Sequence, residues 1–234
     1  MLLSPQLADL ANVTAGQRAL DVGCGPGALT GELVMRLGPE AVSAVDPSEP
    51  FVAAVRERYP GVGVQCASAE SLPFTNQEFD VTLAQLVVHF MKDPVAGLGE
   101  MRRVTRRQGV MAVCVWDHGG AQGPLSVFWE AARQIDPEVE DESDLPGVRE
   151  GHLGELFHAA GLHQVEETSL TVAVEQRTFE DWWEPFTLGV GPAGSYATSL
   201  DPKRQLQLRE AAREKLPAAP FVLTARAWAA RGVV

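Results

Sequence analysis

The chain has 234 residues, of which 45% are hydrophobic and 21% are charged, and its formal net charge is −12 at pH 7. These ordinary globular values exclude wholesale disorder, and the length suits one sizeable α/β domain better than two independent ones. Because a phosphate backbone would be repelled by the negative charge, and no dense stripe of lysine and arginine offsets it, nucleic acid is excluded as an expected partner.

The N-terminus lacks the basic and apolar regions of a secretory signal, and no window of about 18 apolar residues predicts a membrane span. We therefore expect a cytoplasmic protein. The three cysteines, Cys24, Cys66 and Cys114, are far apart and lack CxxC spacing. We expect them to be reduced, with Cys66 and Cys114 buried as small apolar side chains.

The first half of the chain alternates short apolar runs with helical patterns. Strands are expected at 19–22, 41–46, 62–66, 79–83 and 110–116, and helices at 28–37, 50–58 and 94–104. Such alternation predicts βαβ units, and hence an α/β fold with a doubly wound, mostly parallel sheet covered by helices on both faces. Ligands bind such sheets beyond the carboxyl ends of the strands, so the residues that follow each strand are the candidates for function.

The second half of the chain lacks this regular alternation of strands and helices. The sequence predicts a helix at 124–134, a solvated acidic loop at 136–147, a helix at 151–160, and strands at 162–174 and 221–229. Between those last two strands lie an aromatic cluster, a glycine-rich turn at 189–194 and a helix that begins near residue 201.

The turn after the first strand holds an acid and three glycines, Asp21, Gly23, Gly25 and Gly27. Glycines let the backbone approach a ligand and adopt positive φ, while the first N–H groups of the next helix point outward. The spacing also fits the dinucleotide fingerprint, with Asp46 at the next strand end as the acid that binds ribose. However, Asp21 would repel a pyrophosphate and attract an ammonium or sulfonium group. The turn is therefore predicted to hold a cationic ligand, and a nicotinamide-dependent oxidoreductase is the less favoured alternative.

The stretch ALDVGCGPGAL resembles the first motif of the class I S-adenosylmethionine-dependent methyltransferases, acid-x-Gly-x-Gly-x-Gly. AVDPS, ASAESLPF, FDVTLAQLVVHF and EMRRVTRRQGVMAV resemble the later motifs in the family's order, and the resemblance covers residues 15–117. It is to the small-molecule branch, the methyltransferase type 11-like and ubiquinone/menaquinone methyltransferase-like proteins. It implies a seven-stranded Rossmann-like sheet with an antiparallel last strand and a helical lid. It also implies S-adenosylmethionine as methyl donor, and a small-molecule acceptor methylated on oxygen, nitrogen or carbon.

On this resemblance, one group of residues surrounds the cofactor: Asp21, Gly23, Cys24, Gly25, Gly27, Asp46, Pro47, Ser68, Ala69, Glu70, Gln85 and Leu86. Asp46 would accept from both ribose hydroxyls, the alternative being a cap on the following helix. Ser68 stands where the family usually has an aspartate that contacts the adenine amine, so the backbone of Ala69 and Glu70 is expected to take over. Only about fourteen residues precede the matching region, whereas relatives usually carry a further helical segment over the cofactor, so we expect a more open pocket.

Methyl transfer from a sulfonium needs alignment and exclusion of water more than a protein nucleophile. No nucleophile motif or metal-ligand spacing occurs in the sequence, and no metal is expected. His89 is the first candidate for a base and His118 the second, because both follow strands at the edge where substrate binds. The alternative for each is a histidine that is hydrogen-bonded within its own loop.

The resemblance places the insertion between the last two strands above the substrate. We expect a substrate wall of His89, Trp116, His118, Trp182, Trp183 and Phe186, the alternative being that the aromatic residues anchor the lid to the core. An aromatic wall favours a small, largely apolar acceptor. The expected organisation is one domain over 1–234, with a cofactor-binding half at 1–117 and lid segments at 118–150 and 175–220. A protein that binds S-adenosylmethionine without transferring methyl groups is the remaining alternative, and the sequence carries no signal of an oligomeric state.

Overall fold

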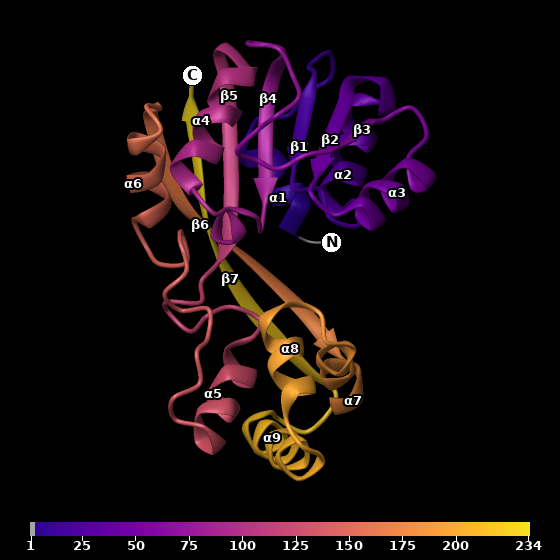
Figure 1. The fold of residues 1–234 in the computed structure, drawn as a ribbon, viewed down its shortest axis with the longest axis vertical. Helices are drawn as coiled ribbons and strands as arrows, with labels where there is room; N and C mark the ends of the chain where they lie inside the picture. Colours follow the sequence, from indigo (N-terminus) through magenta and orange to yellow (C-terminus); the bar gives the residue numbers. More distant parts are fainter. Residues whose placement is uncertain (1–2) are drawn as a thin grey trace. The chain divides into compact units, whose positions relative to one another are not determined.

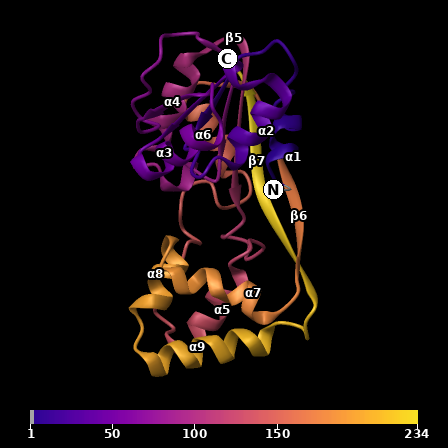
Figure 2. The same ribbon diagram turned by 90° about the vertical axis from the view of Figure 1, so that its right-hand side faces the viewer.

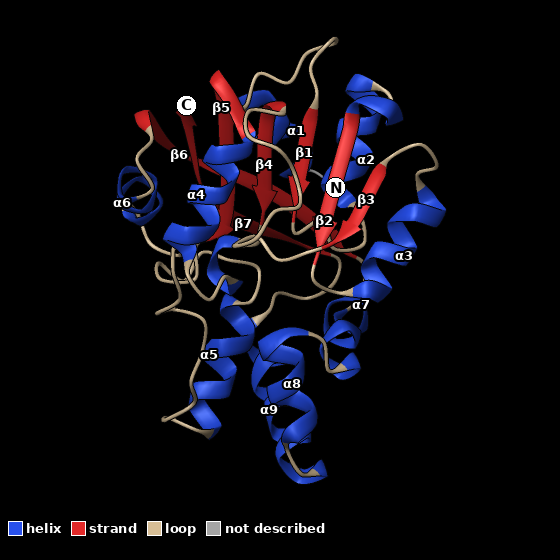
Figure 3. Cartoon of the chain, turned by 45° about the horizontal axis from the view of Figure 1, so that its top comes forward, coloured by secondary structure: helices blue, strands red, loops and turns tan. Residues whose placement is uncertain are grey.

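A seven-stranded sheet with the strand order β3-β2-β1-β4-β5-β7-β6 organises the fold (Figure 3). Neighbouring strands pair in parallel from β3 to β5. The sheet ends differently, because β7 runs against β5 (Figure 1): the N–H of Gln108 donates to the carbonyl of Val234 at 2.6 Å, and the N–H of Val234 donates to the carbonyl of Gly109 at 3.1 Å. The strands are β1 (Ala19–Val22), β2 (Val42–Asp46), β3 (Gly63–Cys66), β4 (Phe79–Gln85), β5 (Thr105–Trp116), β6 (His163–Gln176) and β7 (Phe221–Val233). The predicted Rossmann-like sheet is confirmed.

Helices fill the connections between the strands. In the described part of the chain, residues 3–234, they are α1 (Leu3–Leu10), α2 (Ala28–Leu37), α3 (Glu49–Arg58), α4 (Pro94–Val104), α5 (Ser126–Ile135), α6 (His152–Ala159), α7 (Phe179–Trp183), α8 (Gly191–Ser199) and α9 (Pro202–Lys215). Short 3-10 helices are η1 (Pro39–Ala41), η2 (Val88–Phe90) and η3 (Glu184–Leu188). None of the helices in the described chain combines the length and the apolar character that a membrane crossing requires.

Local sequence signals explain where several helices begin. The side chain of Asp93 accepts a hydrogen bond from the N–H of Ala96 at 3.0 Å, and Pro94 is the first residue of α4. Asp201 caps α9 in the same way before Pro202. An aspartate at the N-cap satisfies an otherwise unpaired N–H group, and proline suits the first helical position because its missing N–H has no partner there.

In the computed structural model, the chain forms two compact units. The first, which we call the sheet unit, comprises the described residues up to Val115 together with 145–170 and 227–234. Its apolar core includes Leu20, Phe79 and Phe157. In this unit α1 packs on α2 and α4 packs on α6, and Figure 2 shows these two pairs on opposite sides of the sheet.

The second unit, which we call the helical unit, comprises residues 116–144 and 171–226. It contains α5, α7, α8 and α9, and its separate core is aromatic, with Phe128 at the centre of several ring contacts. Asp117 is buried within this unit and accepts from the Nε and Nη2 of Arg226 at 2.8 and 2.5 Å.

Four local expectations need correction or addition. The glycine-rich turn is shorter than predicted, because Gly191 already begins α8. The acidic loop is irregular as expected, but Glu142 within it is buried and accepts from the indole Nε1 of Trp129 at 3.0 Å. Cys66 is exposed and not buried, because it ends a strand at the edge of the sheet. The first helix, α1, was not anticipated.

Two buried threonines connect β4 to the start of β5. Thr105 Oγ1 donates to the carbonyl of Met101 at 2.7 Å, so the 2.8 Å contact between the two hydroxyls must use the hydrogen of Thr82. We expect Thr82→Val to lower the free energy of unfolding by about 1 kcal/mol, the usual net value of one hydrogen bond. Thr105→Val should cost more, about 1–3 kcal/mol, because it leaves the buried Thr82 hydroxyl without an acceptor.

Urea unfolding of the two single variants and the double variant measures these costs. The double variant should recover part of the loss caused by Thr105→Val, because no stranded hydroxyl remains. Equal losses in the two single variants would contradict the assigned direction of the hydrogen bond.

Candidate cofactor-binding site

A cavity of about 350 Å³ lies in the sheet unit, beyond the carboxyl ends of β1, β2 and β4. Its wall is built from the end of each strand and the turn or helix that follows. The lining residues are Asp21, Gly23, Cys24, Gly25, Pro26, Ala28, Leu29, Asp46, Pro47, Phe51, Gln85, Leu86, Val87 and Phe90. This edge of a parallel sheet is where α/β folds bind their ligands.

The three glycines of the turn each adopt positive φ, but they do so for different reasons. A Cβ at Gly23 would lie 2.5 Å from Val87 Cγ2, and one at Gly27 would lie 2.8 Å from Tyr59 Cε2. Both glycines therefore allow close packing of the turn against its neighbours. At Gly25 (φ +52°) a Cβ would meet no atom within 4 Å. Since Gly25 lines the cavity, its missing side chain leaves space for a ligand.

Asp46 fastens the end of β2 to the glycine turn. Its Oδ2 accepts from the N–H of Gly25 at 2.9 Å, and its Oδ1 accepts from the N–H of Ser48 at 2.8 Å. These two hydrogen bonds hold the carboxylate in place. Each of its oxygens can accept a second hydrogen bond, so both remain available to a ligand. The helix-cap alternative does not describe this geometry, because Ser48 occupies the N-cap position of α3.

Asp21 brings an incompletely paired carboxyl group to the same cavity. The residue is 1% exposed, and its Oδ2 accepts from Thr30 Oγ1 at 2.6 Å. Among residues 3–234, its Oδ1 has no hydrogen-bond partner, and neither does the buried Oε1 of Gln85. Burial raises the pKa of Asp21 to about 7 against the opposing hydrogen bonds from Thr30, and the nearby charge of Asp46 adds to the rise.

These features fit the cofactor that the sequence predicts. Two buried acceptor oxygens without partners suit a ligand that brings N–H donors or positive charge, since unmade buried hydrogen bonds are costly. The carboxylate of Asp46 suits a pair of hydroxyl donors. A pyrophosphate would instead meet the negative charge of Asp46 and, once ionised, of Asp21. This set of acceptor groups therefore matches S-adenosylmethionine better than a nicotinamide dinucleotide.

Four of the predicted cofactor residues do not line this cavity: Gly27, which packs against Tyr59, and the adenine-side residues Ser68, Ala69 and Glu70. Ser68 is exposed, Ala69 is part of the sheet unit's core, and the Glu70 carboxylate accepts from the N–H of Lys92 at 2.9 Å. The backbone hydrogen bonds to Glu70 help to keep its pKa below the usual value, although partial burial opposes them. Glu70 thus shapes the turn before α4, and the adenine-side role of these three residues stays a prediction.

In the sequence, His89 falls between the lining residues Val87 and Phe90, but it does not line the cavity itself. Its ring is buried and packs against the ring of Phe90, with 3.9 Å between the centroids. A role as base stays a prediction. Leu86, which does line the cavity, has φ +63°, an uncommon conformation for a residue with a side chain.

Sequence reasoning missed the apolar side of the cavity. Phe51 and Phe90 line it although 40% and 59% of their surfaces are exposed. Leu29 and Val87 complete this side. Each of the four follows a strand end within a few residues, so the strand-edge rule that identified Asp21 and Asp46 contained the signal.

The remaining predicted substrate residues belong to the helical unit. Trp182, Trp183 and Phe186 are buried in its aromatic core, where the rings of Phe186 and Phe128 stack with 4.5 Å between the centroids. Trp116 ends β5 and is half-buried. These contacts lie within the helical unit itself, so lining of a substrate pocket and anchoring of the lid to the core both stay predictions.

His118 sits in a buried polar group of the helical unit. Its Nε2 lies 4.0 Å from Glu142 Oε1. Burial lowers the pKa of His118 to about 4, although the charges of Asp141 and Asp117 oppose this shift. The imidazole is therefore neutral near pH 7.

Residues 20–113 match a family model described as a methyltransferase domain. With the fold and the glycine turn described above, this match supports a similarity to the class I S-adenosylmethionine-dependent methyltransferases of the UbiE-like type. Family and fold imply S-adenosylmethionine as the methyl donor.

Several individual proteins are similar to this chain in sequence or in fold. The ubiquinone/menaquinone biosynthesis C-methyltransferase UbiE of Cupriavidus metallidurans is 29% identical over 70% of this chain and 74% of its own length. A ubiquinone biosynthesis O-methyltransferase of Parvibaculum lavamentivorans is 38% identical over 41% of this chain and 39% of its own length. An uncharacterized transposon protein of Streptomyces fradiae is 34% identical, and the chain spans 33% of it. The YcgJ protein of Bacillus subtilis shares the fold, with a TM-score of 0.65, 19% identity, and coverage of 98% of this chain and 97% of that one.

The raised pKa of Asp21 predicts a pH-dependent stability. The folded protein holds the carboxyl proton up to about pH 7, whereas the unfolded chain releases it near the ordinary aspartate pKa of 3.8. The contribution of Asp21 to stability is thus fully present below that lower value and is lost as the pH rises through the folded-state pKa. Asp21→Asn cannot ionise, so its stability relative to wild type should increase from pH 4 to pH 8.

Urea unfolding at several pH values in this range measures the difference. Asp144→Asn, at an exposed position of the helical unit, provides the matched control, and its curve should run parallel to that of the wild type. A parallel curve for Asp21→Asn as well would contradict the raised pKa.

Proposed function

We propose that this chain transfers the methyl group of S-adenosylmethionine to an oxygen, nitrogen or carbon atom of a small molecule. The observation that carries the proposal is the cavity in the sheet unit, which is lined by the carboxyl groups of Asp21 and Asp46. Gln85 Oε1 adds an acceptor without a partner in the described chain, and Gly25 leaves space for a ligand because it has no side chain. When bound, S-adenosylmethionine supplies a methyl group on a positively charged sulfur.

Each polar residue of the cavity has a separate task in this proposal. Asp46 binds the ribose hydroxyls, since its two oxygens are held in place by the N–H groups of Gly25 and Ser48. Asp21 and Gln85 accept from the methionine part, and the ionised form of Asp21 favours the positive charge. These contacts orient the donor, and orientation is the main contribution that an activated donor needs from the protein.

The apolar residues of the cavity have the complementary task. Phe51 and Phe90 place aromatic surface at the cavity wall while remaining partly exposed. Contact with bound ligand would cover that surface and exclude water from it. Leu29 and Val87 continue this surface inside the cavity.

The first acceptors to test are aromatic rings of the quinone-precursor type. One relative is named a C-methyltransferase and another an O-methyltransferase of ubiquinone biosynthesis, which supports that ring class and leaves the methylated atom open. The net charge of −12 also favours a small acceptor over nucleic acid.

Loss of the Asp46 carboxylate tests the ribose contact. We expect Asp46→Ala to weaken binding of S-adenosylhomocysteine at least tenfold, because two charge-assisted hydrogen bonds are lost, and to lower methyl transfer to phenols, amines and quinone precursors in parallel. Calorimetric titration measures the first effect, and transfer of a radiolabelled methyl group measures the second.

Glu49→Gln is the matched control, because Glu49 begins α3 close to Asp46 in sequence but does not line the cavity. Its affinity should stay within about twofold of wild type. Tighter binding of NADH than of S-adenosylhomocysteine would contradict the proposal. Cofactor binding without turnover on any acceptor would identify a binding protein instead.

His89 is the residue that we propose as proton acceptor for hydroxyl substrates. It lies within η2, next to the lining residue Phe90. His89→Gln should lower kcat on a phenolic acceptor by about a hundredfold, the usual range for loss of a general base, and should remove the acidic limb of the pH–rate profile. S-adenosylhomocysteine affinity should change little.

His158→Gln, on the exposed surface of α6, is the control for this histidine substitution. Thermal unfolding of both variants shows whether the fold persists. A His89→Gln variant that is folded and keeps the wild-type kcat and pH profile would rule out this role.

A further inference from the structure

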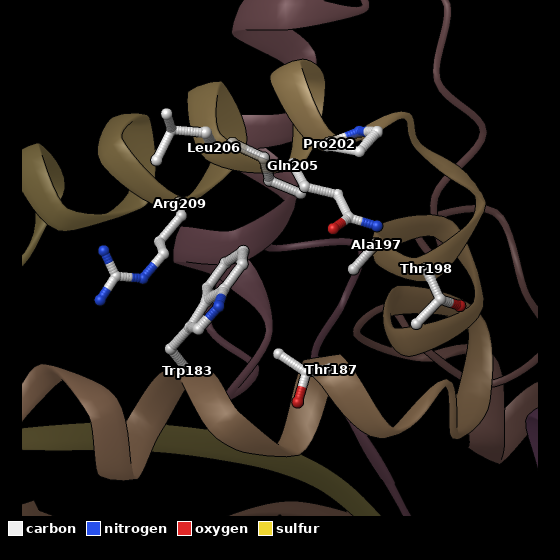
Figure 4. A pocket seen from close by; sticks show the side chains of 9 residues that line it. Trp183, Thr187, Ala197, Thr198, Pro202, Gln205, Leu206 and Arg209 are labelled. Atoms are coloured by element: carbon white, nitrogen blue, oxygen red, sulfur yellow. The ribbon is translucent and has the colours of Figure 1, made fainter.

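The helical unit contains a cavity of its own, of about 340 Å³. Its walls come from α7, η3, α8 and α9, and all of its lining residues lie within this unit (Figure 4). A volume of this size falls within the range of small-molecule sites, about 300–1,000 Å³. None of its lining residues lines the cavity of the sheet unit.

The interior of this cavity is largely apolar. The indole of Trp183 extends from α7 into the space between α8 and α9, and Ala197 faces it (Figure 4). Leu208 adds a fully buried side chain. The hydroxyl of Thr187 donates to the carbonyl of Glu184 at 2.7 Å, and that of Thr198 donates to the carbonyl of Gly194 at 3.0 Å. Figure 4 shows both hydroxyls turned away from the central space.

Gln205 presents a polar atom to the cavity. The amide Nε2 of Gln205 donates to the carbonyl of Leu200 at 3.0 Å, which fixes the orientation of the side chain. Figure 4 shows the amide oxygen of Gln205 on the side that faces Trp183. The cavity therefore offers an acceptor, held in place, against an aromatic wall.

The positive charge at the cavity is already compensated. Arg209 Nη2 donates to Glu180 Oε1 at 2.8 Å, and its Nη1 lies 3.2 Å from Glu210 Oε1. The guanidinium also lies over the ring of Phe179, 5.2 Å from its centroid. An anionic ligand would have to compete with these carboxylates, so the lining favours an uncharged one.

Exposed apolar side chains occur beside the cavity. Leu206, which lines it, is 58% exposed, and Leu188 and Val190 are 74% and 71% exposed. Leu188 directly follows the lining residue Thr187 in the chain. Apolar surface of this kind next to a cavity is typical of a ligand entrance.

We propose that the helical unit binds a small, uncharged aromatic alcohol in this cavity, with the ring against Trp183 and the hydroxyl donating to Gln205 Oε1. The apolar walls select the ring, the inward oxygen selects a donor, and the compensated arginine disfavours an acid. This binding does not depend on methyl transfer.

Calorimetric titration with 2-naphthol tests the proposal, and 2-methoxynaphthalene, which has the same ring but cannot donate, is the matched ligand. Wild type should bind 2-naphthol saturably at one site and prefer it to the ether about tenfold, the usual value of one well-placed hydrogen bond in a buried site. Gln205→Leu should lose this preference. Gln207→Leu, at an exposed position of the same helix that does not line the cavity, should keep it.

Ala197→Phe tests the location independently, because the larger ring would fill the space beside Trp183. We expect it to lower 2-naphthol affinity at least tenfold, while S-adenosylhomocysteine binding in the sheet unit stays unchanged and the near-UV circular dichroism of the helical unit's aromatic core reports that this unit is folded. Absence of saturable 2-naphthol binding in wild type would overturn the proposal. So would equal effects of Gln205→Leu and Gln207→Leu, or unchanged affinity in a folded Ala197→Phe variant.

Discussion

The candidate site depends on the carboxylate of Asp46. One of its oxygens binds the backbone of the glycine turn and the other binds the backbone just before α3. Two loops that follow different strands are thereby fixed to one another at the edge of the sheet. Because each oxygen keeps further accepting capacity, the group that builds the cavity is also free to recognise a ligand. A neutral side chain would hold the loops less strongly and would recognise hydroxyl groups less well.

The other buried acceptors of the cavity lower the stability of the protein instead of increasing it. Asp21 and Gln85 each keep an oxygen without a partner in the described chain, which costs stability in the absence of a ligand. Proteins tolerate such costs mainly at functional sites. Asp46 contributes order to the site, and Asp21 and Gln85 contribute affinity for what enters it. This division of tasks is the physical reason to regard the cavity as a binding site and not as a packing defect.

Much of the sheet unit could be predicted because its signals are local. The bounds of β1, α2 and α4 agree with those expected, because a glycine or proline marks one end of each element: Gly23 follows β1, Gly38 follows α2 and Pro94 begins α4. The start of α8 was missed because Gly191 and Pro192 resemble a turn in sequence, although proline is well suited to the first turn of a helix. Burial of Glu142 could not be predicted, because its partner Trp129 is reached only through packing of the helical unit. Phe51 is a different case, because the periodicity of α3 did not mark it and only its place shortly after the end of β2 pointed to the cavity.

The position of Asp21 has a consequence for turnover. Methyl transfer converts a sulfonium, which is positively charged, into a thioether, which is not. An ionised carboxylate in the cavity attracts the donor through its full charge and loses that attraction as soon as the reaction is complete. Since the pKa of Asp21 is raised to about 7, the fraction of ionised carboxylate changes with pH near neutrality. Under the proposed function, the same buried acid that would select the charged donor would also favour exchange of spent product for fresh donor, most strongly on the alkaline side of its titration.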